Sequence, residues 1–236
     1  MRAALPVPSA AGLADPDRPL LSYLDHSSGA RHDLSAAALG DLAARARVAV
    51  LLPPHWRTAA VLLGAWSVGM EVSFRPRATA GLPVLEPGGD RPYDAVLVTP
   101  ERLDDWLEDV PDGLHRYLVG TGPQPLVDVP VGWLDWSVEV LRHGVAPTDR
   151  PVLHAHDAAS PDGTSYAEWG SIARAVAEQL DLRAGDRLLV DVAEHDQPLK
   201  WLLAPLAAGA SVLLCANLDP SRRDTLIAAE QVTRIL

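Results

Sequence analysis

Two short stretches of this sequence hold the side chains best suited to binding a divalent metal or moving a proton. They gather three imidazoles and three carboxylates, namely His154, His156 and Asp157 in one stretch and Glu194, His195 and Asp196 in the other. Imidazole nitrogens and carboxylate oxygens are common ligands of divalent metals. His154 and His156 are two positions apart, so both would point to the same side of an extended strand.

The spacing of these residues matches no recognised metal signature, and two interpretations stay open. In the first, the six residues form a ligand-binding rim, with His154, His156 and His195 as candidate metal ligands. In the second, they are a solvated rim at two strand ends, with incidental histidines. His55 occupies the same place as His195 in an internal repeat described below, which favours a framework role such as helix capping or packing.

Other side chains offer less chemistry, and we assign no catalytic residue and no cofactor. A serine hydrolase would need a Gly-x-Ser-x-Gly turn, which the sequence does not contain. Ser165 and Glu168 instead predict a capping box at the start of a helix. Cys215 lies in an apolar strand and is predicted to be an inert core thiol.

The elements that position the candidate rim come from an internal repeat. Residues 41–74 align without gaps with residues 181–214, and 10 of the 34 pairs are identical. Each copy has a short apolar run, a turn, a helix-length apolar segment, a glycine and a second apolar run. This order predicts two β-α-β units of one design, each with parallel strands joined by a crossover helix.

The elements around the repeat are predicted from apolar runs and cap residues. We expect strands at Leu20–Leu24, Asp94–Val98, Arg116–Gly120, Pro151–His156 and Val232–Leu236. Helices are predicted from Pro100 to Glu108, from Trp133 to Arg142, and from Pro198 to Ala208. We interpret the acidic residues Asp104, Asp105, Glu108 and Asp109 as a solvated helix end. Trp133 and Trp136 are predicted to pack into the core, with an apolar patch for a partner as the alternative.

Composition excludes some classes of partner. The formal net charge of −11 and the pI near 5.0 argue against nucleic-acid binding. The longest uncharged apolar run, 201–216, is interrupted by Pro205 and Gly209 and is shorter than the roughly 20 residues needed to cross a bilayer. The N-terminus lacks the apolar run of a signal peptide, and the single cysteine fits a reducing compartment. We therefore expect a cytoplasmic protein.

Three segments of the sequence resemble the adenylate-forming enzymes, which include the acyl-CoA synthetases, the luciferases and the peptide-synthetase adenylation domains. The segments are Ser165–Trp169, Leu182–Arg187 and Leu206–Ala210, and Arg47–Phe74 is similar to the N-terminal subdomain of the same enzymes. The similarity covers 20–236 and looks closest to short actinobacterial relatives. It implies an α/β fold of two similar, mostly parallel β-α-β subdomains, with a lead-in at 1–19 and subdomains at 20–145 and 146–236.

The same resemblance implies a phosphate-binding loop that this sequence does not carry. Family members place a loop rich in Ser, Thr and Gly, with a lysine, before the helix that here begins near Ser165. Here the interval is the connector Asp157–Gly163, which has one glycine, one serine, no lysine and two carboxylates. Carboxylates at a desolvated phosphate site would repel the phosphates. The family's later motifs and its C-terminal lid would lie beyond Leu236.

These departures predict a truncated, non-catalytic relative that binds a small ligand or a protein partner, and a homodimer would cover apolar surface left by the truncation. The first alternative is an AMP-forming ligase whose site is completed by another chain. The second is a metal-dependent hydrolase at the histidines. The sequence identifies neither the ligand nor the biological pathway.

Overall fold

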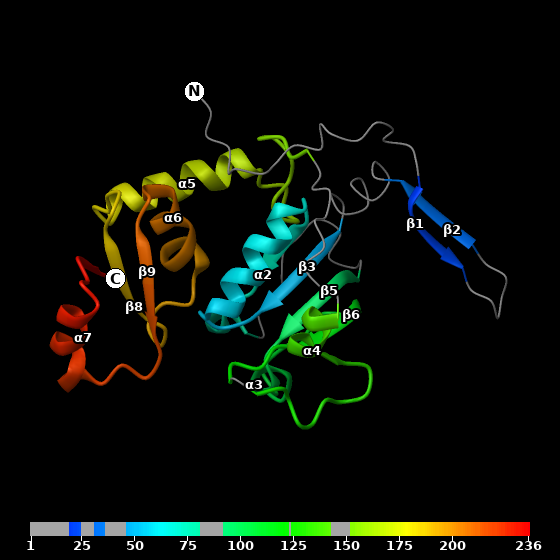
Figure 1. Cartoon of the computed structure of the whole chain (residues 1–236), viewed down its shortest axis with the longest axis horizontal. Coiled ribbons are helices and arrows are strands. Elements are labelled where there is room, and N and C mark those ends of the chain that lie inside the picture. The colour runs from blue at the N-terminus through cyan, green and yellow to red at the C-terminus, as the bar shows by residue number, and fades with distance from the viewer. Residues whose placement is uncertain (1–18, 25–30, 36–45, 81–91, 123, 143–151) are drawn as a thin grey trace.

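The computed structural model describes residues 19–24, 31–35, 46–80, 92–122, 124–142 and 152–236. Within them the chain forms an α/β structure with two parallel sheets, of five and three strands, and a separate antiparallel pair (Figure 1). The pair joins β1 (Pro19–Leu24), which confirms the first predicted strand, to β2 (Arg31–Ser35), which was not predicted. None of the helices in this described part of the chain is long and apolar enough to span a bilayer.

The larger sheet has the strand order β4-β3-β5-β6-β7, and each neighbouring pair is parallel. Its strands are β3 (Arg47–Leu51), β4 (Glu71–Phe74), β5 (Tyr93–Val98), β6 (Gly113–Leu118) and β7 (Leu134–Asp135). All residues of β3 are buried, as expected for an inner strand of a sheet covered on both faces. Val48 and Val50 pack in one core cluster, while Ala49 and Leu51 pack in a second cluster on the opposite face.

The crossover from β3 to β4 is α2 (Trp56–Ser67), which lies beside the sheet in Figure 1. The helix begins at the N-cap His55, whose Nδ1 accepts a hydrogen bond of 3.2 Å from Arg57 N. The chain leaves the helix through Gly69 at φ 82°, a left-handed conformation that a glycine adopts without a Cβ clash. Short helices follow β4, β5 and β7, namely η1 (Arg77–Thr79), α3 (Pro100–Leu103) and α4 (Trp136–Arg142).

The smaller sheet repeats the design of the first β-α-β unit. Its strands are β8 (Arg187–Asp191), β9 (Ser211–Cys215) and β10 (Arg234–Ile235), in the order β10-β8-β9. Arg47 pairs with Glu71 in the first unit and Arg187 with Ser211 in the second, which is the same register after the 140-residue offset. Gly209 also matches Gly69, with φ 75°. The prediction of two units of one design is therefore confirmed.

The helices of the second half differ more from expectation. The helix α5 (Tyr166–Gln179) begins with the predicted capping box of Ser165 and Glu168. The predicted helix 198–208 is present, but its first part is π-helical, η2 (Leu199–Leu203), and continues directly into α6 (Ala204–Ala208). Pro205 lacks the N–H that a continuous α-helix would use there, which accounts for the irregularity. The chain then passes through η3 (Pro220–Arg222) and α7 (Arg223–Ala229) to β10.

The two halves share one hydrophobic core. A single cluster of buried residues includes Val50 and Leu62 from the first half and Leu188, Trp201 and Leu202 from the second. Trp201 is 1% exposed and is one of the largest fully buried side chains in the described residues. The proposed link between the subdomains, 146–151, lies outside the described residues, so the boundary between them stays a prediction.

Candidate functional site

The segment predicted as the strand Pro151–His156 is not a strand in its described residues, 152–156. Asp157 Oδ2 accepts a hydrogen bond of 2.6 Å from His154 N, and Asp157 N donates to His154 O at 3.1 Å. These bonds curl the chain into a turn, because the carboxylate competes for the backbone N–H that a sheet would use. The rings of His154 and His156 stack with their centroids 5.4 Å apart, and His156 Nε2 lies 3.9 Å from Asp157 Oδ1.

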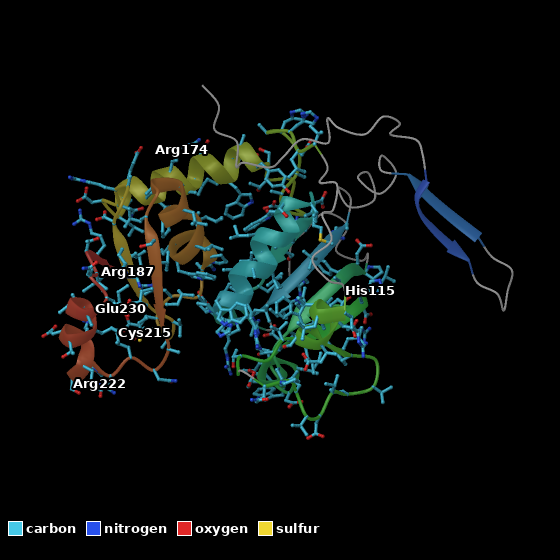
Figure 2. The ribbon with its side chains drawn as sticks, in the orientation of Figure 1. His115, Arg174, Arg187, Cys215, Arg222 and Glu230 are labelled. Atoms are coloured by element: carbon cyan, nitrogen blue, oxygen red, sulfur yellow. The ribbon has the colours of Figure 1, made fainter. Side chains whose placement is uncertain are left out.

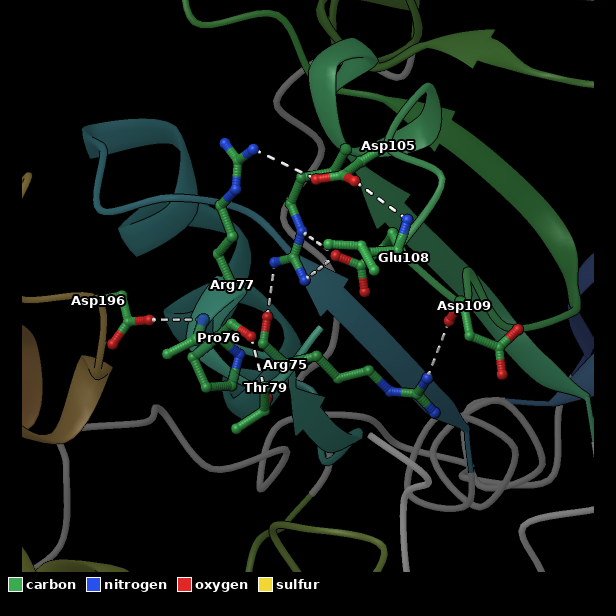
Figure 3. A network of polar contacts seen from close by, with 11 residues as sticks. Arg75, Pro76, Arg77, Thr79, Asp105, Glu108, Asp109 and Asp196 are labelled. Atoms are coloured by element: carbon green, nitrogen blue, oxygen red, sulfur yellow. Dashed lines mark hydrogen bonds and ion pairs between the residues drawn. The ribbon is translucent and has the colours of Figure 1, made fainter. Parts of the chain in front are cut away.

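The second candidate stretch follows β8 and faces the first half of the chain. Asp196 Oδ2 accepts a hydrogen bond of 3.4 Å from Ala78 N in η1, as Figure 3 shows, and Asp196 O accepts one of 3.2 Å from Trp201 Nε1. Glu194 N donates to Asp191 O at 3.2 Å, which closes the turn that immediately precedes His195. Across the described residues there is no group of three or more His, Cys, Asp or Glu side chains that could hold a metal ion. The three candidate imidazoles therefore do not form a ligand set in this structure.

The connector Asp157–Gly163 folds into a closed loop. The N–H groups of Ala159 and Ser160 donate to Thr164 O at 2.8 and 3.3 Å, and Gly163 N donates to Ser160 O at 3.0 Å. Ala158 forms an isolated antiparallel bridge with Ser165. The Ser160 hydroxyl is buried and accepts a hydrogen bond of 2.6 Å from Trp169 Nε1. The groups that would contact a phosphate in a phosphate-binding loop are here used within the chain.

The connector is also tied to the first half of the molecule. Ala159 O accepts two hydrogen bonds, from Val72 N at 2.9 Å and from Trp66 Nε1 at 3.0 Å. Just beyond the connector, the Tyr166 hydroxyl donates to Trp66 O at 3.0 Å. Burial, and then the nearby carboxylates Asp157 and Glu71, raise the pKa of Tyr166, so its hydroxyl stays protonated as this donor. The connector is thus fixed between β4, α2 and α5.

A polar network that the sequence analysis missed lies at the carboxyl ends of β4 and β5 (Figure 3). The Arg102 guanidinium binds Glu108 Oε2 through Nε at 2.7 Å and Nη2 at 2.5 Å, and it donates from Nη1 to Arg75 O at 2.7 Å. The side chains of Arg102 and Glu108 are 5% and 4% exposed. The interpretation of Glu108 as part of a solvated helix end is therefore wrong, because α3 ends at Leu103 and the following turn carries Glu108 inward.

A second buried arginine, Arg57, lies at the same sheet edge. It is 7% exposed, and its Nη1 donates to Gly120 O just after β6. Its guanidinium carbon lies 5.2 Å from the centre of the Trp56 ring, in a cation–π contact. Nothing in the sequence distinguished Arg57 from the exposed arginines, because its burial depends on where β6 ends relative to α2.

His55, beside Arg57, gives the N-terminus of α2 a pH-sensitive cap. Burial first, and then the positive charge of Arg57, lower the pKa of His55 from its ordinary 6.5. The cap requires a neutral ring, because Nδ1 accepts the hydrogen bond from Arg57 N. The framework role proposed for His55 from the repeat is confirmed.

We expect wild-type protein to lose stability relative to His55→Asn as the pH falls. A lowered folded-state pKa contributes stability that is present above pH 6.5 and is lost as the pH falls through the folded pKa. Asparagine also caps helices but does not titrate. Urea unfolding at several values above and below pH 6.5 measures the difference. If the free energy of unfolding changes equally with pH in the two proteins, the His55 ring is not the pH-sensitive cap.

Contrary to the prediction, Cys215 is not buried in the core. It is partly exposed and lines a pocket of about 330 Å³ with Leu218, Arg222, Thr225 and Leu226 among its neighbours. Figure 2 labels Cys215 and Arg222, which lie on the side of the small sheet that faces α7. The thiol is accessible because β9 ends at Cys215 and the chain turns away toward η3. By contrast, Trp133 and Trp136 pack against the two core clusters, as predicted.

Comparisons with known proteins place this geometry in context. No protein-family model matches the sequence. A "TIGR03089 family protein" of Mycobacterium tuberculosis is 33% identical over an alignment 244 residues long, gaps included. The alignment covers 94% of this chain and 93% of that protein. The match therefore extends over nearly the full length of both chains.

Solved structures with the same fold are acyl-CoA synthetases. The N-terminal domain of FACL13 from Mycobacterium tuberculosis has a TM-score of 0.51 at 18% identity, covering 92% of this chain and 58% of that chain. An acyl-CoA synthetase from Brucella canis has a TM-score of 0.55 at 18% identity, covering 94% and 45%. Acetoacetyl-CoA synthetase from Streptomyces lividans has a TM-score of 0.54 at 17% identity, covering 96% and 40%. The expected fold is confirmed, and this chain spans only part of the length of each enzyme.

Proposed function

This chain belongs to the TIGR03089 family and has the fold of the N-terminal domain of acyl-CoA synthetases, and we propose that it is a binding module that does not adenylate a substrate. The observation that carries the proposal is the closed connector Asp157–Gly163. Phosphate-binding loops direct backbone N–H groups and hydroxyls toward the ligand. In the connector, the N–H groups of Ala159, Ser160 and Gly163 donate to backbone carbonyls instead.

Two further features support the proposal. The connector cannot open without breaking contacts elsewhere, since Ala159 O holds both Val72 N and Trp66 Nε1. Its two carboxylates would also repel a polyphosphate, and each caps a backbone N–H: Asp157 that of His154 and Asp162 that of Thr164. Lys200 is the single lysine of the chain and lies exposed on η2, away from the connector in sequence. The module would instead bind a small molecule or a partner at another surface.

ATP–pyrophosphate exchange with a panel of carboxylic acids tests the proposal. We expect no exchange above the background of the assay from the purified chain. We expect the same result from Asp162→Asn, because asparagine removes a charge and can still accept the hydrogen bond from Thr164 N. The connector of this variant would stay closed although its charge is lower.

The two proteins separate charge from backbone geometry. Robust exchange by the wild-type chain would overturn the proposal and favour the AMP-forming ligase. Exchange by Asp162→Asn alone would show that repulsion, and not the closed backbone, excludes the nucleotide, which would contradict the argument made here. A rise in melting temperature with ATP would report binding without turnover, because a ligand of the native state stabilises it.

A further inference from the structure

Two arginines, Arg57 and Arg102, are buried at the carboxyl edge of the larger sheet. Each donates a hydrogen bond to a backbone carbonyl, but only Arg102 also binds a carboxylate. Arg102 donates from Nη1 to a backbone carbonyl, that of Arg75, and directs Nε and Nη2 at the Glu108 carboxylate. This side-on pair of donors is the face that arginine uses for bidentate recognition of carboxylates and phosphates. Arg102 thus has a backbone carbonyl on one side of its guanidinium and a carboxylate on the other, where Nε makes the hydrogen bond and Nη2 makes only an ion-pair contact.

Arg57 has the bond from Nη1 to a backbone carbonyl but lacks the contact with a carboxylate. Its Nη1 donates to the backbone carbonyl of Gly120, and it is 7% exposed. Its Nε is buried without a hydrogen-bond partner, and no carboxylate in the described part of the chain pairs with its guanidinium. The other contact of its charged group is with the ring of Trp56. Arg57 therefore leaves its Nε without a partner, whereas the Nε of Arg102 binds an acid.

The surroundings of Arg57 favour a negative charge. Arg57 belongs to the first turn of α2, a helix of 12 residues, and a helix N-terminus carries positive partial charge. A buried charge without a partner is unfavourable, so the chain loses stability by keeping this arginine unpaired. The site lies where parallel strands end, which is the edge at which open α/β sheets bind ligands. Leu126 lies next to Gly120, whose carbonyl accepts the hydrogen bond from Arg57.

We propose that the Nε–Nη2 face of Arg57 binds an oxyanion, a carboxylate or phosphoryl group, of a small ligand. An anionic oxygen of the ligand would take the place that Glu108 Oε2 takes on Arg102, and the Trp56 ring would lie against the part of the ligand next to the anion. This inference rests on the proposed binding function and names its ligand class. It does not involve the connector, which lies at the other end of α2, near Trp66.

Titration of ¹⁵N-labelled protein with sodium acetate and, separately, with sodium phosphate at constant ionic strength tests the inference. The Nε–H signal of Arg57 is identified by its absence from the spectrum of Arg57→Lys. We expect this signal in the wild-type protein to shift saturably with one or both anions. If acetate saturates the shift at the lower concentration, the anionic group of the ligand is a carboxylate. If phosphate does so, it is a phosphoryl group.

The variants show whether the guanidinium is responsible. Arg57→Lys has no Nε–H signal, so anion binding is compared in the two proteins through the indole N–H signal of Trp56, whose ring contacts Arg57. Because lysine keeps the charge but loses the paired donors, the anion affinity measured at this signal should weaken at least roughly tenfold. Arg174→Lys changes an exposed arginine on α5 and should leave the response unchanged (Figure 2). Because the wild-type shift is measured directly, the test does not depend on the stability of a variant.

Failure of this inference is distinct from failure of the proposed function. No saturable shift with either anion, or an equal response in Arg57→Lys, would overturn the anion site and leave the closed connector intact. Pyrophosphate exchange that persists in Arg57→Lys would overturn the non-adenylating function and leave the anion site intact.

Discussion

Glu108→Gln is expected to lower the free energy of unfolding by about 3 to 5 kcal/mol, the range found when one partner of a buried ion pair is removed. The side chains of Arg102 and Glu108 are 5% and 4% exposed, so the Arg102 guanidinium would stay buried without its counter-charge. The glutamine amide oxygen can still accept a hydrogen bond from Arg102, but neither it nor Arg75 O supplies the missing negative charge. Urea denaturation followed by circular dichroism measures the loss.

Two controls define the mechanism of this loss. Glu178→Gln removes the same carboxylate from an exposed position on α5 and should change stability by no more than about 0.5 kcal/mol. The double variant Arg102→Met/Glu108→Leu should lose less than Glu108→Gln alone, because it leaves no buried charge unpaired. A loss below about 1 kcal/mol for Glu108→Gln would mean that the pair behaves as an exposed one.

Trp201→Ala is expected to lower the free energy of unfolding by about 3 to 5 kcal/mol, as for other large-to-small changes in a core. Trp201 is 1% exposed and belongs to the cluster that contains residues of both sheets. Its Nε1 also donates to Asp196 O, so the substitution removes a hydrogen bond as well. Chemical denaturation should still show one transition, at lower denaturant concentration.

The matched control is Trp106→Ala, at a tryptophan that is 88% exposed and follows α3. It should change stability by no more than about 0.5 kcal/mol. If the wild-type protein unfolds in two separate transitions and Trp201→Ala shifts only one of them, the two sheets do not depend on a common core. Coincident transitions by tryptophan fluorescence and circular dichroism are the expected result.

The framework could be predicted because its signals are local or repeated. Continuous apolar runs predicted β3 and β8, and the 140-residue offset predicted two β-α-β units of one design, in which β4 and β9 pair with these strands. The capping box at Ser165 and the proline after Thr99 placed the starts of α5 and α3. Each of these signals is complete within a few residues or within one copy of the repeat.

The polar sites could not be predicted because they depend on distant partners. Glu108 looks like any acid after a short helix until Arg102 is seen to be buried beside it. Arg57 needs the carbonyl of Gly120, which is 63 residues away. The segment 152–156 was predicted as a strand from its apolar residues, but the Asp157 side chain takes a backbone N–H that a sheet would need. Composition contains none of this information.

The hydrogen bond accepted by Ala159 O limits which substitutions in the connector this protein can tolerate. β4 is an outer strand of its sheet, and the hydrogen bond from Val72 N to Ala159 O covers part of its unpaired edge. Substitutions that reopened the connector for a nucleotide would uncover that edge, and exposed strand edges promote aggregation between molecules. Opening the connector to a nucleotide would therefore require a second, compensating change that protects β4.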